Sequence, residues 1–141
     1  MYDALTIAAI ADELADTIVR GRVQRVQHAD ELTLSFEIYA QGRRRWLTAS
    51  ASPQDARIVA EVGRPPVDSD IVSPMLLLLR KYARGARVLA VDQPRFERIL
   101  RITLAQTDHE DADEDEAPEL IINDLVIELM GRHSNIILVD E

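Results

Sequence analysis

Residues 32–38 read LTLSFEI, and their strict alternation of apolar and polar side chains decides how the chain folds. A period of two is typical of a β-strand that buries one face. Gln41-Gly42 then predicts a tight turn, and residues 43–50 predict the strand that returns beside the first. The centre of the fold is therefore an antiparallel hairpin.

Outward from this hairpin, the chain predicts two helices and about eight strands. Asp3 can cap a helix with an apolar stripe, and Gly21 can stop it. Ser73-Pro74 predicts a second helix over residues 74–84 that ends at Gly85. The apolar residues expected in the core are Leu5, Ile7, Ile10, Leu14 and Ile18 of the first helix and Met75, Leu76, Leu78, Leu79 and Tyr82 of the second. The other predicted strands are residues 23–27, 57–62, 87–91, 97–106, 120–130 and 136–139. Because no parallel βαβ alternation appears, the predicted class is α+β with a mainly antiparallel sheet or sandwich.

Composition predicts one domain over residues 1–141, since 141 residues with 47% hydrophobic content are enough to form one hydrophobic core. The net charge of -9 is concentrated, because eight of the 25 acidic residues lie in residues 108–119 and leave 17 acids against 16 bases. We expect the segment at about 107–118 to be a disordered, solvated hairpin tip. A calcium loop is the alternative, but the segment lacks the glycine and the terminal glutamate at the required spacing.

Arginines gather in clusters that can match phosphate geometry. The clusters are Arg20, Arg22 and Arg25; Arg43, Arg44 and Arg45; Arg80, Lys81, Arg84 and Arg87; and Arg95, Arg98 and Arg101. Each could equally be a solvated face or a strand edge. Trp46 follows one cluster, where it is either an exposed stacking platform or a residue packed against a helix.

Signals for a membrane, a metal or catalysis are weak. The longest apolar stretch, around residues 75–79, is too short for a bilayer, and the N-terminus has no basic segment or cleavage site of a signal peptide. The absence of cysteine is compatible with a cytoplasmic location. Three histidines lie on different segments without metal-ligand spacing, and no phosphate-binding glycine motif occurs. We therefore expect no cofactor, no metal and no enzymatic activity.

Three motifs are recognisable together: PMLLLLRKY at residues 74–82, QPRFERIL at 93–100 and MGRHSNIILVDE at 130–141. In sequence and in order along the chain they resemble motifs of the N-terminal domain of the NFACT family, also called fibronectin-binding protein A. The resemblance covers essentially the whole chain. It implies a fragment of a longer protein, with a fold similar to the N-terminal β-sandwich of formamidopyrimidine-DNA glycosylases. Those enzymes attack with an N-terminal proline, and here the first proline is Pro53.

The resemblance also implies a function. Family members of the RqcH type bind the large ribosomal subunit and tRNA in ribosome-associated quality control, where alanyl-tRNA supplies alanine for tailing stalled chains. The implied partners are therefore tRNA, the large ribosomal subunit and the stalled nascent chain-tRNA, with no membrane partner. The rival hypothesis is an adhesin-type module that binds fibronectin, for which an export signal would be the discriminating feature.

Asp3, Glu97 and Arg98 form the candidate site. In the family, an acid near the N-terminus and an Asp-Arg pair are implicated in tRNA contact, and Glu97 stands where the family has aspartate. An acid beside an arginine can orient the guanidinium for stacking on a base or binding a phosphate. The structural alternative is a helix cap at Asp3 and a surface strand pair at Glu97 and Arg98.

Arg132, His133, Ser134 and Asn135 form a second candidate patch. Their side chains suit contacts with an RNA backbone. Alternatively, they form an internal turn in which Ser134 and Asn135 bond nearby backbone groups.

Overall fold

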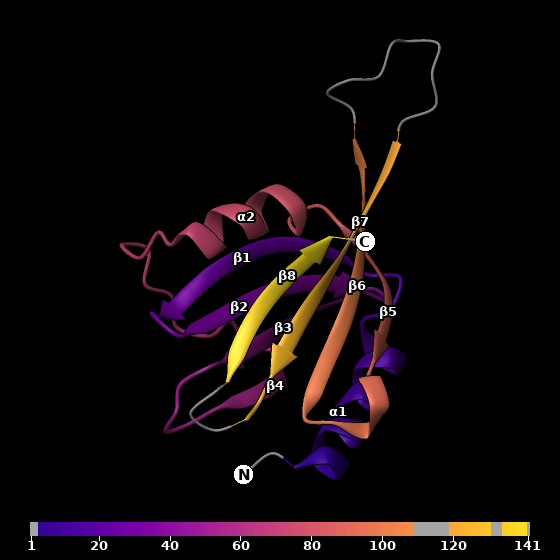
Figure 1. The fold of residues 1–141 in the computed structure, drawn as a ribbon. Helices are drawn as coiled ribbons and strands as arrows, with labels where there is room; N and C mark the ends of the chain where they lie inside the picture. The colour runs from indigo at the N-terminus through magenta and orange to yellow at the C-terminus, as the bar shows by residue number, and fades with distance from the viewer. Residues whose placement is uncertain (1–2, 109–118, 131–133, 141) are drawn as a thin grey trace.

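The chain is described by a computed structural model at residues 3–108, 119–130 and 134–140. Within these residues the fold is α+β, with two α-helices and one antiparallel sheet of eight strands in the order β4-β3-β2-β1-β5-β6-β7-β8 (Figure 1). The elements are α1 (Ala4–Thr17), β1 (Arg22–Asp30), β2 (Thr33–Ala40), β3 (Arg43–Ser50), β4 (Arg57–Glu61), α2 (Pro74–Tyr82), β5 (Arg87–Asp92), the 3-10 turn η1 (Pro94–Phe96), β6 (Ile99–Asp108), β7 (Glu119–Glu128) and β8 (Asn135–Asp140). The predicted class is confirmed.

The sheet consists of two four-stranded halves that share a core. The halves meet at β1 and β5, whose ladder pairs Arg22 with Arg87. One cluster of buried apolar side chains contains Phe36 of the first half and Leu125 and Ile127 of the second. Figure 1 shows β7 and β8 crossing in front of β1, β2 and β3. The two halves therefore enclose their apolar faces between them.

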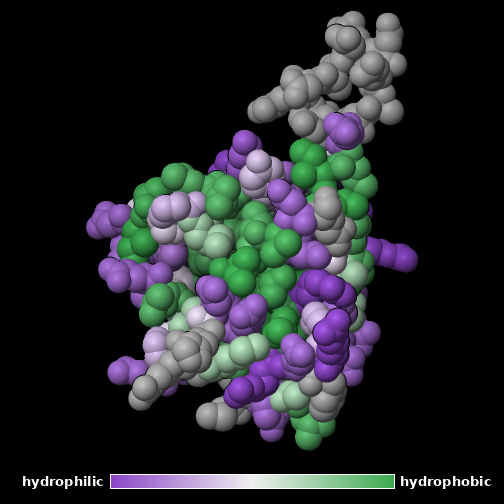
Figure 2. Space-filling model, in the orientation of Figure 1, coloured by the Kyte–Doolittle hydropathy of each residue, from purple (hydrophilic) through white to green (hydrophobic). Residues whose placement is uncertain are grey.

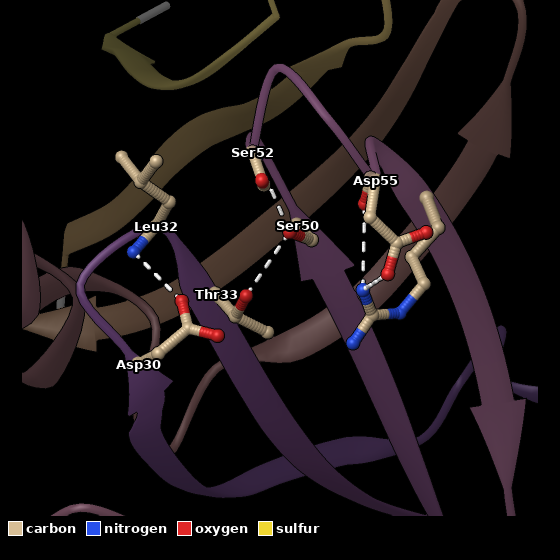
Figure 3. Close-up of polar contacts among 7 residues, drawn as sticks. Asp30, Leu32, Thr33, Ser50, Ser52 and Asp55 are labelled. Atoms are coloured by element: carbon tan, nitrogen blue, oxygen red, sulfur yellow. Dashed lines mark hydrogen bonds and ion pairs between the residues drawn. The ribbon is translucent and has the colours of Figure 1, made fainter.

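The central hairpin has the predicted turn. Gln41 and Gly42 have φ angles of 54° and 73°, the left-handed pair that a two-residue hairpin of matching twist requires. At the opposite end of β2 and β3, side chains hold the connections (Figure 3). Asp30 Oδ1 accepts a hydrogen bond from the Leu32 N–H at 3.0 Å, and Thr33 Oγ1 donates to Ser50 Oγ at 3.0 Å. These contacts fix the register of the first half.

Both helices begin at their predicted N-caps, Asp3 and Ser73, but α1 ends at Thr17 and α2 at Tyr82, before the predicted stops. One expected core residue in each helix is also wrong. Leu5 is 70% exposed and Leu78 is 47% exposed, whereas Ile7 and Leu76 are buried. A helix turns by about 100° per residue, so positions two apart lie on opposite sides. Figure 2 shows the resulting hydrophobic surface over the region where Figure 1 labels α2. No helix in the described part of the chain is both long and apolar enough to span a bilayer.

The strand predicted to start at residue 97 starts two residues later. Pro94 and the φ of 51° at Arg95 fold the chain into η1, and β6 begins at Ile99. Glu97 and Arg98 therefore lie in the bend before the strand and not in a strand pair. The predicted acidic loop is also shorter at its start, because β6 pairs with β7 as far as Asp108 and Glu119. Residues 109–118 lie outside the described residues.

Part of the outer face of the first half, opposite the shared core, is buried as well. It carries Glu37, whose side chain is 7% exposed and lies 3.9 Å from the Arg25 guanidinium and 3.7 Å from that of Arg44. Trp46 is 1% exposed on this face, with the Arg64 guanidinium 5.6 Å from its ring centroid. Trp46 is therefore not an exposed stacking platform. The Arg64 side chain, from the segment between β4 and α2, lies over the Trp46 ring.

Candidate functional site

Three segments that are far apart in the sequence meet at one pocket of about 480 Å³. Asp3 and Ala4 come from the start of α1, Glu97 and Arg98 from the bend before β6, and Met130 from the segment that follows β7. The structure thus brings together all three residues of the first candidate site. They lie where the beginning of the chain approaches one end of the second half of the sheet.

Backbone contacts fix the relative positions of these segments. The Gln93 side-chain amide donates to the Ala4 carbonyl at 2.8 Å and to the Glu97 carbonyl at 2.6 Å. The Leu129 N–H donates to the Arg98 carbonyl at 2.9 Å. Because these bonds use main-chain carbonyls, the side chains of Glu97 and Arg98 do not have to hold the bend together.

Asp3 is the N-cap of α1, as predicted. Its Oδ1 accepts a hydrogen bond from the Thr6 N–H at 2.8 Å. That bond holds the pKa of the exposed Asp3 carboxyl below its usual value of 3.8. The cap contribution is therefore fully present above the unfolded pKa and is lost as the pH falls through the folded pKa. At neutral pH, Asp3 brings a negative charge to the rim of the pocket.

The charged side chains of the pocket do not neutralise one another directly. Among the described residues, the ion pairs within 4.0 Å do not include one between Arg98 and either Asp3 or Glu97. Glu97 is exposed and Arg98 is half-buried. The pocket thus offers one guanidinium donor and two carboxylate acceptors to a ligand. The expected direct orientation of Arg98 by an acid is not observed.

The second candidate patch adjoins this pocket through Met130. The Met130 N–H donates to Ser134 Oγ at 3.1 Å, and the Ile136 N–H donates to Asn135 Oδ1 at 3.1 Å. Both side chains bond nearby backbone groups, as in the internal-turn alternative. Arg132 and His133 lie outside the described residues.

Comparison with known proteins identifies the family of the chain. The family model described as NFACT N-terminal and middle domains matches residues 3–141. The chain belongs to the NFACT family. Among the relatives, it is 30% identical over 141 residues to the Rqc2 homolog RqcH of Streptococcus pneumoniae serotype 2, and 29% identical over 140 residues to that of Bacillus subtilis. These alignments cover 99% of this chain but only 24% and 23% of the relatives.

Solved N-terminal domains of fibronectin-binding proteins have the same fold. The N-terminal domain of the fibronectin-binding protein PavA from Streptococcus pneumoniae matches with a TM-score of 0.88 and 30% identity. The N-terminal part of the fibronectin/fibrinogen-binding protein from Streptococcus suis matches with a TM-score of 0.89 and 26% identity. Each match covers 100% of this chain and 50% of the solved one.

Two residues of this NFACT domain with specific polar contacts were missed at the sequence level. His28 is buried, with Nδ1 2.9 Å from the Asp30 carbonyl and Nε2 2.7 Å from Ser73 Oγ. Since a carbonyl only accepts, the Nδ1–H of His28 donates to the Asp30 carbonyl. Arg64 donates through Nη2 to Gln27 Oε1 at 3.1 Å. Neither contact has a local sequence signal. Ser73 is 45 residues from His28. Arg64 lies in a loop without periodicity, and its partners Gln27 and Trp46 belong to strands.

Proposed function

We propose that this NFACT domain is a non-enzymatic tRNA-binding module that associates with the large ribosomal subunit in ribosome-associated quality control. The observation that carries the proposal is the convergence of Asp3, Glu97 and Arg98 in one pocket, although some ninety residues separate Asp3 from the other two. Membership of a family with RqcH proteins supports it. Under this proposal the parent protein works in the cytoplasm, and its ligand is the alanyl-tRNA used for alanine tailing.

The side chains of the pocket suit single-stranded RNA. The Arg98 guanidinium can bind a phosphate or stack on an unpaired base, as planar guanidinium groups do. The Asp3 and Glu97 carboxylates can accept hydrogen bonds from base edges or ribose hydroxyls. The fold is also proposed to share the architecture of formamidopyrimidine-DNA glycosylases. Those enzymes need an N-terminal proline as nucleophile, whereas a module that only binds RNA does not.

Arg98→Ala should weaken tRNA retention on large ribosomal subunits by roughly 10- to 100-fold, because a charge-assisted contact is lost. The measurement is pelleting of the intact parent protein with purified subunits, followed by quantification of bound tRNA. Arg98→Lys should recover only part of the binding, since a lysine keeps the charge but not the planar fork.

Arg43→Ala is the matched control for Arg98→Ala. Arg43 is exposed and follows the hairpin turn at Gln41, whose side chain donates to the Asp16 carbonyl near the far end of α1 from Asp3. The Arg43→Ala substitution removes the same charge as Arg98→Ala, but at a position outside the pocket. Equal losses in the two variants, or full retention of tRNA by Arg98→Ala at an unchanged melting temperature, would reject the site.

Asp3 can be tested without losing the helix cap. Asp3→Asn keeps a good cap but removes the charge, whereas Asp3→Ala removes both. We expect Asp3→Asn to retain the wild-type melting temperature at pH 7 and to bind tRNA more weakly, and Asp3→Ala to lose stability as well. Wild-type tRNA binding by Asp3→Asn would restrict Asp3 to its capping role.

Fibronectin binding is the second candidate function, because the matched PavA and Streptococcus suis structures carry fibronectin-binding names. Immobilised fibronectin, probed with the intact protein and the Arg98→Ala variant, tests it separately. Saturable binding of fibronectin without any retention of tRNA would favour this candidate over the RNA-binding one.

A further inference from the structure

A second hollow, the arginine groove, lies on the side of the first half where α2 packs near β1. It has a volume of about 420 Å³. Its rim is formed by Arg25 of β1, Arg64 of the segment after β4, and Arg80 and Arg84 of α2 and its end. The groove therefore collects four arginines on a chain whose net charge is -9.

Three of these arginines have no carboxylate partner within 4.0 Å among the described residues. In the described ranges, the ion pairs within 4.0 Å include Arg25, which lies 3.9 Å from Glu37, but not Arg64, Arg80 or Arg84. Asp68 is the acid that lines the groove, and its Oδ1 accepts a hydrogen bond from the Asp70 N–H at 3.1 Å. With four arginines and one aspartate, the lining keeps a net positive charge.

Arg64 is held in place before any ligand arrives. Its Nη2 donates to Gln27 Oε1 at 3.1 Å, and the guanidinium lies over the buried Trp46 ring at 5.6 Å. Gln27 is fixed in turn, since its Nε2 donates to the Pro65 carbonyl at 3.4 Å. A guanidinium has five N–H donors, so most remain available to a ligand. Fixing it beforehand lowers the entropy cost of binding.

Arg80 of α2 and Arg84, just after the end of that helix, add a second pair of donors. Both are exposed and line the same hollow, Arg80 from the last turn of α2 and Arg84 from the turn that follows the C-cap Ala83. Such a pair suits two successive phosphates of one strand. Guanidinium groups match phosphate oxygens by paired hydrogen bonds.

We propose that the arginine groove binds backbone phosphates of RNA. The inference rests on the proposed function for its ligand class, but it uses residues separate from the pocket of Asp3, Glu97 and Arg98. The groove would hold the backbone of the RNA whose unpaired bases meet the pocket. Contacts to phosphate position a nucleic acid without reading its sequence, so the groove adds affinity and not choice of tRNA.

The test is the salt dependence of tRNA binding by the intact protein, measured by fluorescence anisotropy for wild type and for the double variant Arg80→Gln/Arg84→Gln. These two side chains can change without disturbing the anchored Arg64. Losing two phosphate contacts should reduce the slope of log K against log salt by about 1.4–1.8. Arg43→Gln/Arg87→Gln, which removes two exposed arginines outside both hollows, is the matched control and should change the slope less.

The outcomes separate the two proposals. If Arg98→Ala weakens binding but Arg80→Gln/Arg84→Gln behaves like its control, the groove is rejected and the proposed function stands. If the groove variant lowers the slope while Arg98→Ala binds normally, the groove stands and the pocket is rejected. Calorimetric titration with inorganic phosphate tests whether the groove binds free phosphate and not the phosphates of an RNA backbone. Phosphate binding that the groove variant abolishes, with tRNA binding unchanged, would overturn the assignment to RNA.

Discussion

Replacing Trp46 with alanine should lower the free energy of unfolding by about 3–5 kcal/mol, as expected for a large aromatic side chain that is removed from a buried site. Trp46 is 1% exposed, although it lies outside the shared apolar core. The substitution also removes the ring over which Arg64 lies. Urea unfolding followed by circular dichroism is the suitable measurement, since Trp46 is the only tryptophan and its fluorescence disappears in the variant.

Tyr39→Ala is the matched control. Tyr39 is an aromatic residue on the same outer face, but it is 48% exposed, so its loss should change stability by about 0.5 kcal/mol or less. A Trp46→Ala variant as stable as Tyr39→Ala would mean that the ring is exposed in solution. That result would restore the interpretation of Trp46 as a stacking platform.

Gly21→Ala should cost about 3 kcal/mol, because the added methyl group has no space. A Cβ at Gly21 would lie 2.7 Å from the Ala40 Cβ, 2.8 Å from the Ile18 carbonyl oxygen and 2.9 Å from the Tyr39 carbonyl oxygen. Two of these atoms belong to the backbone, so relief requires α1 and β2 to move apart. The same urea unfolding measurement applies.

Gly63→Ala is the control for this substitution. Nothing lies within 4 Å of a Cβ at Gly63, and its φ is not left-handed. It should therefore be neutral or slightly stabilising, through the lower entropy of the unfolded chain. If Gly21→Ala is equally neutral, the close approach between α1 and β2 is looser in solution than in the structure.

Gly21 also shows how a correct residue can be given the wrong reason. The sequence predicts it as the stop of the first helix, where a left-handed φ is common. In the structure Arg20 has the left-handed φ, at 72°, and Gly21 is needed for close packing. Composition near a helix end indicates that glycine is required, but only the neighbouring β2 strand reveals why.

The candidate site was predictable from the sequence only in part. The cap at Asp3 followed from local chemistry, and its hydrogen bond to Thr6 is observed. The link between Asp3 and Arg98 came from the family resemblance, because no periodicity relates positions so far apart. The bend at Glu97 was missed, since Arg95 adopts its left-handed φ without the glycine that usually signals one.

By itself, the sequence determined the local elements of this protein: the period of two that makes β2 a strand, the Gln41-Gly42 turn, and the caps at Asp3 and Ser73. Each depends on neighbours within a few residues. Tertiary structure alone decided that the outer face around Trp46 is buried and that Arg64 joins Arg80 and Arg84 at one groove. The physical reason is that alternation assigns a side chain to one face of a sheet, but it carries no information about which distant loop will cover that face.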